Sequence, residues 1–134
     1  MAAFNKFNCF VADLANKVHN LGSDTLTIAL TASANAPVVG STTLPTQIAY
    51  TNCSPRVVTI TGSTQTSGAY SLVGTDLTLT ASGGAIAAFR YVILYNATAV
   101  SSNLIGWWDY TSDVTILTGE TFLINFDTTI LTLS

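Results

Sequence analysis

His19, the single histidine of the chain, is the residue on which most hydrolytic mechanisms would depend. A Ser-His-Asp arrangement needs an imidazole to accept the serine proton, and no second histidine is present to serve it. No serine stands in a GxSxG turn, and the sequence contains no Walker or GxGxxG glycine pattern. We therefore expect no catalytic residue and no cofactor, and we assign His19 to a capping or surface role at the end of a helix.

Acidic side chains gather in the last quarter of the chain as Asp109, Asp113, Glu120 and Asp127. Paired carboxylates can hydrolyse glycosides, and clustered ones can bind calcium. These four lie beside predicted turns, where Asp and Glu side chains accept hydrogen bonds from nearby backbone N–H groups. We interpret them as turn residues and predict no metal site.

The two cysteines, Cys9 and Cys53, stand far apart and outside any CxxC pair. Zinc sites and disulfide frameworks use several cysteines at short spacings. Both are therefore expected to be reduced thiols that pack as small apolar groups.

Charge is scarce throughout the sequence. Four Lys or Arg and seven Asp or Glu make 8% of the 134 residues charged, against about 25% in an ordinary soluble domain. Because a surface with so few charges favours association, we expect a subunit that packs against other protein and forms a homo-oligomer, either a dimer or a trimer. Nucleic acid is excluded as a direct partner, since four scattered basic residues cannot replace the counterions of a phosphate backbone.

The apolar residues are distributed over many short segments. No run approaches the roughly 18 apolar residues of a transmembrane helix, and the N-terminus lacks the pattern of a secretory signal. The sequence therefore predicts a protein that is made in the cytoplasm and has no membrane partner.

A helical spacing occupies the N-terminal segment, residues 1–22. Apolar residues recur three and four positions apart, which predicts a helix over residues 4–19. Asp13 and Lys17 make an i,i+4 pair, and Gly22 follows as a cap. The apolar stripe consists of Phe4, Phe7, Val11, Leu14 and Val18.

Beyond residue 25 the period changes to two, as in half-buried strands. Residues 25–30 form the first strand, with Leu26, Ile28 and Leu30 on the buried face. We predict a single domain over residues 1–134, mainly β, built as an antiparallel β-sandwich or jelly roll of about eight strands with one N-terminal α-helix. The later strands are expected at 56–61, 69–73, 76–81, 89–95, 104–110, 114–117, 121–126 and 130–133.

Residues 31–54 form an extended loop or arm. Pro37 and Pro45 interrupt any ladder pairing there, and so long an irregular connection is uncommon unless it is functional. We expect neighbouring subunits to order this arm and to contact it together with Phe4, Phe7 and Val11.

Aromatic residues of two strands complete the predicted surface. Residues 89–95 are apolar on both faces and read as a central strand. Trp107 and Trp108 must point in opposite directions because they are adjacent in a strand. An outward Trp108 beside Tyr110 would anchor a protein interface or, alternatively, stack on a sugar ring.

Four segments of the chain resemble small structural proteins of tailed bacteriophages. They are FNKFNCFVADLA (4–15), VHNLGSDTLTIAL (18–30), LIGWWDY (104–110) and VTILTGETFLINFD (114–127). Within phage particles, small all-β proteins of this size resemble the cement or decoration proteins of the capsid. The resemblance implies a virion protein on the capsid surface that binds the major capsid protein and stabilises the shell against internal DNA pressure. The alternative is a receptor- or carbohydrate-binding module associated with the tail or fibre.

Overall fold

The computed structural model describes residues 2–134 and is mainly β, with antiparallel sheets and one short N-terminal α-helix, as predicted from the sequence. The elements in chain order are β1 (Asn5–Lys6), α1 (Asn8–Ala15), β2 (Leu26–Thr31), the 3-10 turn η1 (Ser33–Asn35), β3 (Ile60–Thr66), β4 (Ala69–Gly74), β5 (Leu77–Thr80), β6 (Ile86–Asn96), β7 (Leu104–Ile116), β8 (Thr121–Ile124) and β9 (Leu131–Leu133).

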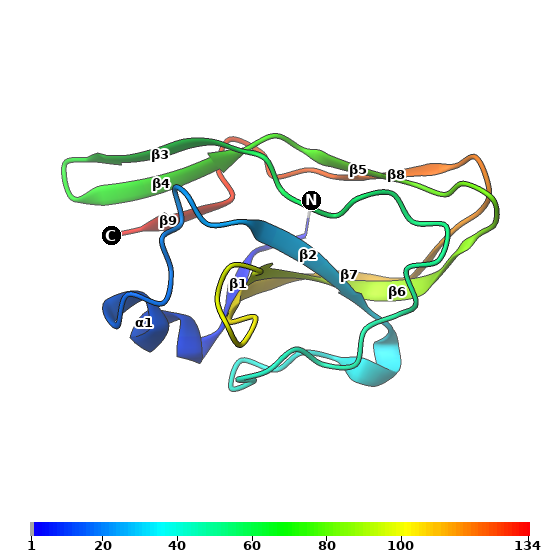
Figure 1. The fold of residues 1–134 in the computed structure, drawn as a ribbon, viewed down its shortest axis with the longest axis horizontal. Helices are drawn as coiled ribbons and strands as arrows, with labels where there is room; N and C mark the ends of the chain where they lie inside the picture. Colours follow the sequence, from blue (N-terminus) through cyan, green and yellow to red (C-terminus); the bar gives the residue numbers. More distant parts are fainter. Residues whose placement is uncertain (1) are drawn as a thin grey trace.

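The strands lie in two layers that face each other (Figure 1). One layer is the four-stranded sheet β1-β7-β6-β2. The other contains the three-stranded sheet β3-β4-β9 and, beside it, the two-stranded sheet β5-β8. This arrangement is compatible with a β-sandwich, and the main core lies between the layers. Its large, fully buried side chains include Phe10, Phe89, Trp108, Phe126, Leu72 and Leu79.

The four-stranded sheet carries a buried apolar cluster on each of its faces. Leu26, Ile28 and Leu30 of β2 face the main core, as their spacing predicts. The alternate β2 residue Ala29 is also fully buried, because it belongs to a second apolar cluster with Phe7 and Ile93. Leu44, from the long connection, packs against this second cluster. The connection therefore serves as a cover for the outer face of the sheet.

The end of the same connection covers the free edge of β2. Ile48 N–H donates to the carbonyl of Leu30 at 3.0 Å, and Val58 N–H donates to the carbonyl of Leu26 at 2.9 Å. The Arg56 guanidinium donates to the carbonyl of Ile28 and lies 3.5 Å from the ring centroid of Tyr50. Residues 48–58 thus contact the domain itself, and the ordering of the arm by neighbouring subunits stays a prediction. Because Arg56 and Val58 bond to the edge of β2, the next strand begins at Ile60 and not at the predicted residue 56.

The helix is shorter than its apolar spacing predicts. Residues 4–7 are not helical, because Asn5 and Lys6 pair with Trp107 and Gly106 as strand β1. The apolar spacing of residues 4–7 is compatible with either conformation. What selects the strand is a partner 100 to 102 residues away in the sequence, which local periodicity does not report.

The C-terminal cap of α1 also differs from the prediction. Lys17 adopts a φ of 64°, and Gly22 lies beyond the cap. The N–H groups of Lys17 and Val18 donate to the carbonyls of Leu14 and Asp13, which closes a left-handed helix end. The Asp13 side chain accepts a hydrogen bond from Asn103 instead of pairing with Lys17.

Strands β6 and β7 form the central hairpin of the four-stranded sheet. The two predicted strands at 104–110 and 114–117 are one long strand, β7, in which Thr111 has a φ of 69°. Asp109 and Asp113 therefore lie within a strand and do not flank a turn.

Candidate functional site

The aromatic residues predicted at the N-terminal contact surface point into the protein. Phe7 is fully buried and packs on Trp107, with ring centroids 4.5 Å apart. Phe4 is half-buried, and its ring lies 5.3 Å from that of Trp108. Neither ring forms an exposed anchor, because each fills a space created by strand β7.

Trp107 and Trp108 point to opposite faces of β7, as adjacent strand residues must. Trp108 is only 2% exposed and contacts Phe126 in the main core, so the expectation of an outward Trp108 platform is wrong. Tyr110 is half-buried against Phe122, and burial raises the pKa of its phenol. The buried hydroxyl of Tyr110 has no hydrogen-bond partner within residues 2–134. This geometry does not provide the flat, exposed pair of rings that would stack on a sugar.

Exposed valines replace these aromatics as the apolar surface. Pro37 is buried and Pro45 half-buried, but Val38 and Val39 between them are 61% and 53% exposed. Val11 on α1 is 54% exposed. We call Val11, Val38 and Val39 the valine patch.

Two hydrogen bonds join the segments that carry the valine patch. The N–H of Asn8, at the start of α1, donates to the carbonyl of Val39 at 2.9 Å, and the Cys9 thiol donates to the carbonyl of Ser41 at 3.5 Å. No charged residue occurs between Asp24 and Arg56 in the sequence. Val38 and Val39 therefore lie in a stretch of the connection without charged residues, and this stretch is bonded to the start of the helix that carries Val11. Sequence reasoning missed Val38 and Val39, although two adjacent valines in a Pro- and Gly-bounded loop are a usable signal.

His19 is buried and does not have the predicted capping or surface role. Its Nδ1 accepts a 3.1 Å hydrogen bond from the Asn96 side-chain amide, whose nitrogen also donates to Asp24 at 2.6 Å. The imidazole packs on the Phe10 ring at 5.2 Å. Burial lowers the pKa of His19, although the negative charges of Asp13 and Asp24 partly oppose that shift. Burial therefore favours the neutral form of the imidazole.

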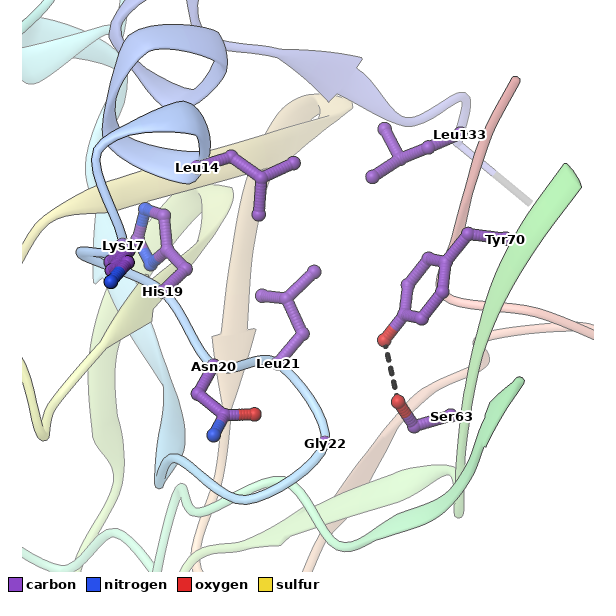
Figure 2. A pocket seen from close by; sticks show the side chains of 9 residues that line it. All are labelled: Leu14, Lys17, His19, Asn20, Leu21, Gly22, Ser63, Tyr70 and Leu133. Carbon is purple, nitrogen blue, oxygen red and sulfur yellow. Dashed lines mark hydrogen bonds between the residues drawn. The ribbon is translucent and has the colours of Figure 1, made fainter. Parts of the chain in front are cut away.

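An open groove of about 540 Å³ lies between the α1 side of the molecule and the β3–β4 hairpin (Figure 2). It is lined by Leu14, Lys17, His19, Asn20, Leu21, Gly22, Ser63, Tyr70 and Leu133. The Ser63 and Tyr70 hydroxyl groups bond to each other at 2.9 Å, and the His19 Nε2 atom is buried. The lining residues include no carboxylate, and the Ser63 hydroxyl is bonded to Tyr70 and not to His19, so the groove does not pair this serine with a base.

The acidic residues have separate structural partners. Asp109 forms a two-point ion pair with Arg90, at 2.8 and 3.0 Å, and the hydrogen bonds to Arg90 lower the pKa of Asp109. Asp113 accepts from the backbone and hydroxyl of Ser33 and so ties η1 to β7. Glu120 accepts the N–H of Leu117 within a turn.

Cys9 and Cys53 are unpaired, half-buried thiols, and burial raises the pKa of both. Across residues 2–134, no three His, Cys, Asp or Glu side chains are grouped closely enough to hold a metal ion. The described part of the chain also contains no helix that is long and apolar enough to cross a membrane.

Comparison with protein families, curated proteins and solved structures finds no match to this chain.

Proposed function

We propose that this protein is a structural subunit of a bacteriophage virion, most specifically a capsid decoration protein that binds the major capsid protein on the particle surface. The observation that carries the proposal is the valine patch, of which Val38 and Val39 lie in a segment without charged residues. Burying apolar side chains against a partner is favourable, and this segment has no ionised group that would lose its hydration. The resemblance of four sequence segments to phage structural proteins supports the same function.

The mechanism of such a protein is passive. A rigid two-layer body with an apolar contact surface links neighbouring shell subunits, and its binding energy opposes their separation under internal DNA pressure. A sugar-binding module is less well supported, because Trp108 lies in the core and Tyr110 is half-buried.

Copy number in purified particles of the phage that encodes the chain tests the proposal directly. A stained gel should show this protein in hundreds of copies per particle, comparable to the shell subunits. A few copies would indicate a tail or fibre component, and its absence from particles would refute a virion role.

Rebinding to particles that lack the protein tests the surface. Val38→Asp with Val39→Asp removes two apolar contacts of about 1.5 kcal/mol each, which predicts about a 100-fold loss of affinity. Leu123→Asp is the matched control, because Leu123 is 52% exposed on β8 in the other layer. Equal rebinding by both variants would contradict the assignment of the contact surface.

A further inference from the structure

Strand β3 is the longest strand in the second layer with an unpaired edge. In the sheet order β3-β4-β9 it pairs only with β4, and its outer edge bonds to no other strand within residues 2–134. The comparable edge of β2 is covered by the connection, whereas β9 has three residues and β1 has two. β3 has seven residues.

The hairpin geometry identifies which backbone groups face outward. Ser67 and Gly68 form the two-residue turn with φ angles of 51° and 85°, as in the mirror-image turns that suit hairpins. Thr66 and Ala69 flank the turn and form a hydrogen-bonded pair, so that alternate pairs along the ladder exchange bonds. Thr64 therefore bonds toward β4, and Ser63 and Gln65 direct their N–H and C=O groups to the free edge.

This edge lacks the features that usually prevent strand pairing. Natural edge strands carry lysine, proline or inward charges, or they are very short. β3 reads Ile-Thr-Gly-Ser-Thr-Gln-Thr, and no charged residue occurs between Arg56 and Asp76. The one register shift falls between Ile60 and Gly62, which leaves residues 62–66 regular, and residues 63–66 are exposed.

We propose that β3 pairs antiparallel with β3 of a second copy of this chain, about a twofold axis at Thr64. In this register Ser63 of each copy exchanges both backbone hydrogen bonds with Gln65 of the other, and the two Thr64 side chains lie opposite each other. The dimer contains a continuous six-stranded sheet in the order β9-β4-β3-β3-β4-β9.

A second copy fits this edge because the segment is self-complementary. A twofold interface brings the same residues together, and like charges directly opposite each other are unfavourable. Threonine opposite threonine is a favourable cross-strand pair, and no charge lies near the axis to oppose it. The sequence predicts self-association, and this dimer assigns the contact to strand β3. The dimer does not depend on the valine patch or on a capsid partner.

A cysteine at the axis tests the register in purified protein. Opposite Cβ atoms in an antiparallel pair lie about 4.5–5.5 Å apart, so two copies of Thr64→Cys can form a disulfide. Mild oxidation should convert Thr64→Cys to a covalent dimer, whereas wild-type protein and Thr118→Cys stay monomeric on a non-reducing gel. Thr118 is the matched control because it is an exposed threonine in a turn outside β3. The wild-type protein contains Cys9 and Cys53, so its behaviour on the same gel shows whether these two thiols form intermolecular disulfides.

Sedimentation of unoxidised protein tests the dimer itself. Wild-type protein and Thr118→Lys should dimerise at micromolar concentration, and Thr64→Lys should weaken the dimer about fivefold by placing two like charges opposite each other. Circular dichroism confirms that each variant is folded. A monomeric wild type, an unchanged Thr64→Lys dimer, or a dimer that Thr64→Cys does not cross-link would each overturn the proposal. None of these results would bear on particle binding through the valine patch.

Discussion

Asn96 is expected to be the most sensitive polar residue of the fold. Its side chain is fully buried at the end of β6 and makes four hydrogen bonds. The amide nitrogen donates to His19 and Asp24, and the amide oxygen accepts from the N–H groups of Thr98 and Ala99. Asn96→Ala removes all four bonds at once.

The magnitude follows from which groups water can reach after the substitution. Thr98 is exposed and Ala99 is half-buried, so water can replace the amide oxygen at their N–H groups. The bond to the Asp24 carboxylate is worth about 2 kcal/mol and the bond to buried His19 about 1 kcal/mol. We therefore expect Asn96→Ala to lower the free energy of unfolding by about 3 kcal/mol.

Urea unfolding near neutral pH measures this loss, with Asn103→Ala as the control. Asn103 makes one side-chain hydrogen bond, to the Asp13 carboxylate, and its removal should cost about 2 kcal/mol, which is less than the loss of both bonds in Asn96→Ala. Equal losses for the two variants would refute the view that Asn96 organises a buried cluster. A changed urea dependence in Asn96→Ala would instead show an altered unfolded or native state.

Replacing Asn96 by Asp tests the protonation state of His19. In the wild type the folded pKa of His19 is lowered below 6.5, so the unfolded state binds the proton more strongly and stability falls as the pH drops below about 6.5. In Asn96→Asp the new carboxyl lies beside both Nδ1 of His19 and the Asp24 carboxylate, so the two carboxyls share a proton, and their remaining negative charge favours the charged imidazole and raises its folded pKa relative to the wild type. Stability of this variant should therefore fall less than that of the wild type as the pH drops below about 6.5. The same pH dependence in both proteins would contradict the assigned hydrogen bond.

Three further substitutions probe single features, each by urea unfolding. Lys17→Gly should stabilise the protein by about 1 kcal/mol, because it relieves a left-handed φ at the helix cap; a loss of stability would show that the Lys17 side chain contributes more than the strain costs. Tyr110→Phe should stabilise it by about 1 kcal/mol by removing a buried hydroxyl without a partner, and destabilisation would reveal an unseen bond. Gly106→Ala should destabilise the protein by several kcal/mol, because the new Cβ would lie 2.6 Å from the carbonyl oxygen of Asn5 and would displace β1. Near-wild-type stability of this variant would show that β1 contributes little.

Sequence patterns predicted the strands in which apolar residues mark the buried faces. The continuous apolar stretch at 89–95 indicated a central strand, and it lies within β6, between β7 and β2. The opposite directions of Trp107 and Trp108 were likewise predictable, although the face that each occupies was not. The alternation of side chains along a strand shows that adjacent residues point to opposite faces of the sheet. Which segments pack against each face depends on distant parts of the chain.

The mispredicted features depend on long-range partners. His19 is buried, and the partner of its Nδ1 atom is Asn96, which is 77 residues away in the sequence. Residues 48–58 are ordered by the edge of β2, which no local pattern signals. Two hydrogen bonds between α1 and the connection bring the segments of the valine patch together, so composition alone located only its neighbourhood.

The pairing of β1 with β7 has a consequence for how the chain folds. The β3–β4 and β6–β7 hairpins join strands that are close in sequence, whereas Asn5 meets Trp107 across nearly the whole chain. Closing so large a loop costs more entropy than closing a hairpin, and contacts of high sequence separation slow folding. During synthesis the first strand emerges from the ribosome early but has no partner until Gly106 and Trp107 follow. The N-terminus is therefore the last part of the four-stranded sheet to be locked in place, and the aromatic ring of Phe7 stays exposed to other nascent chains until then.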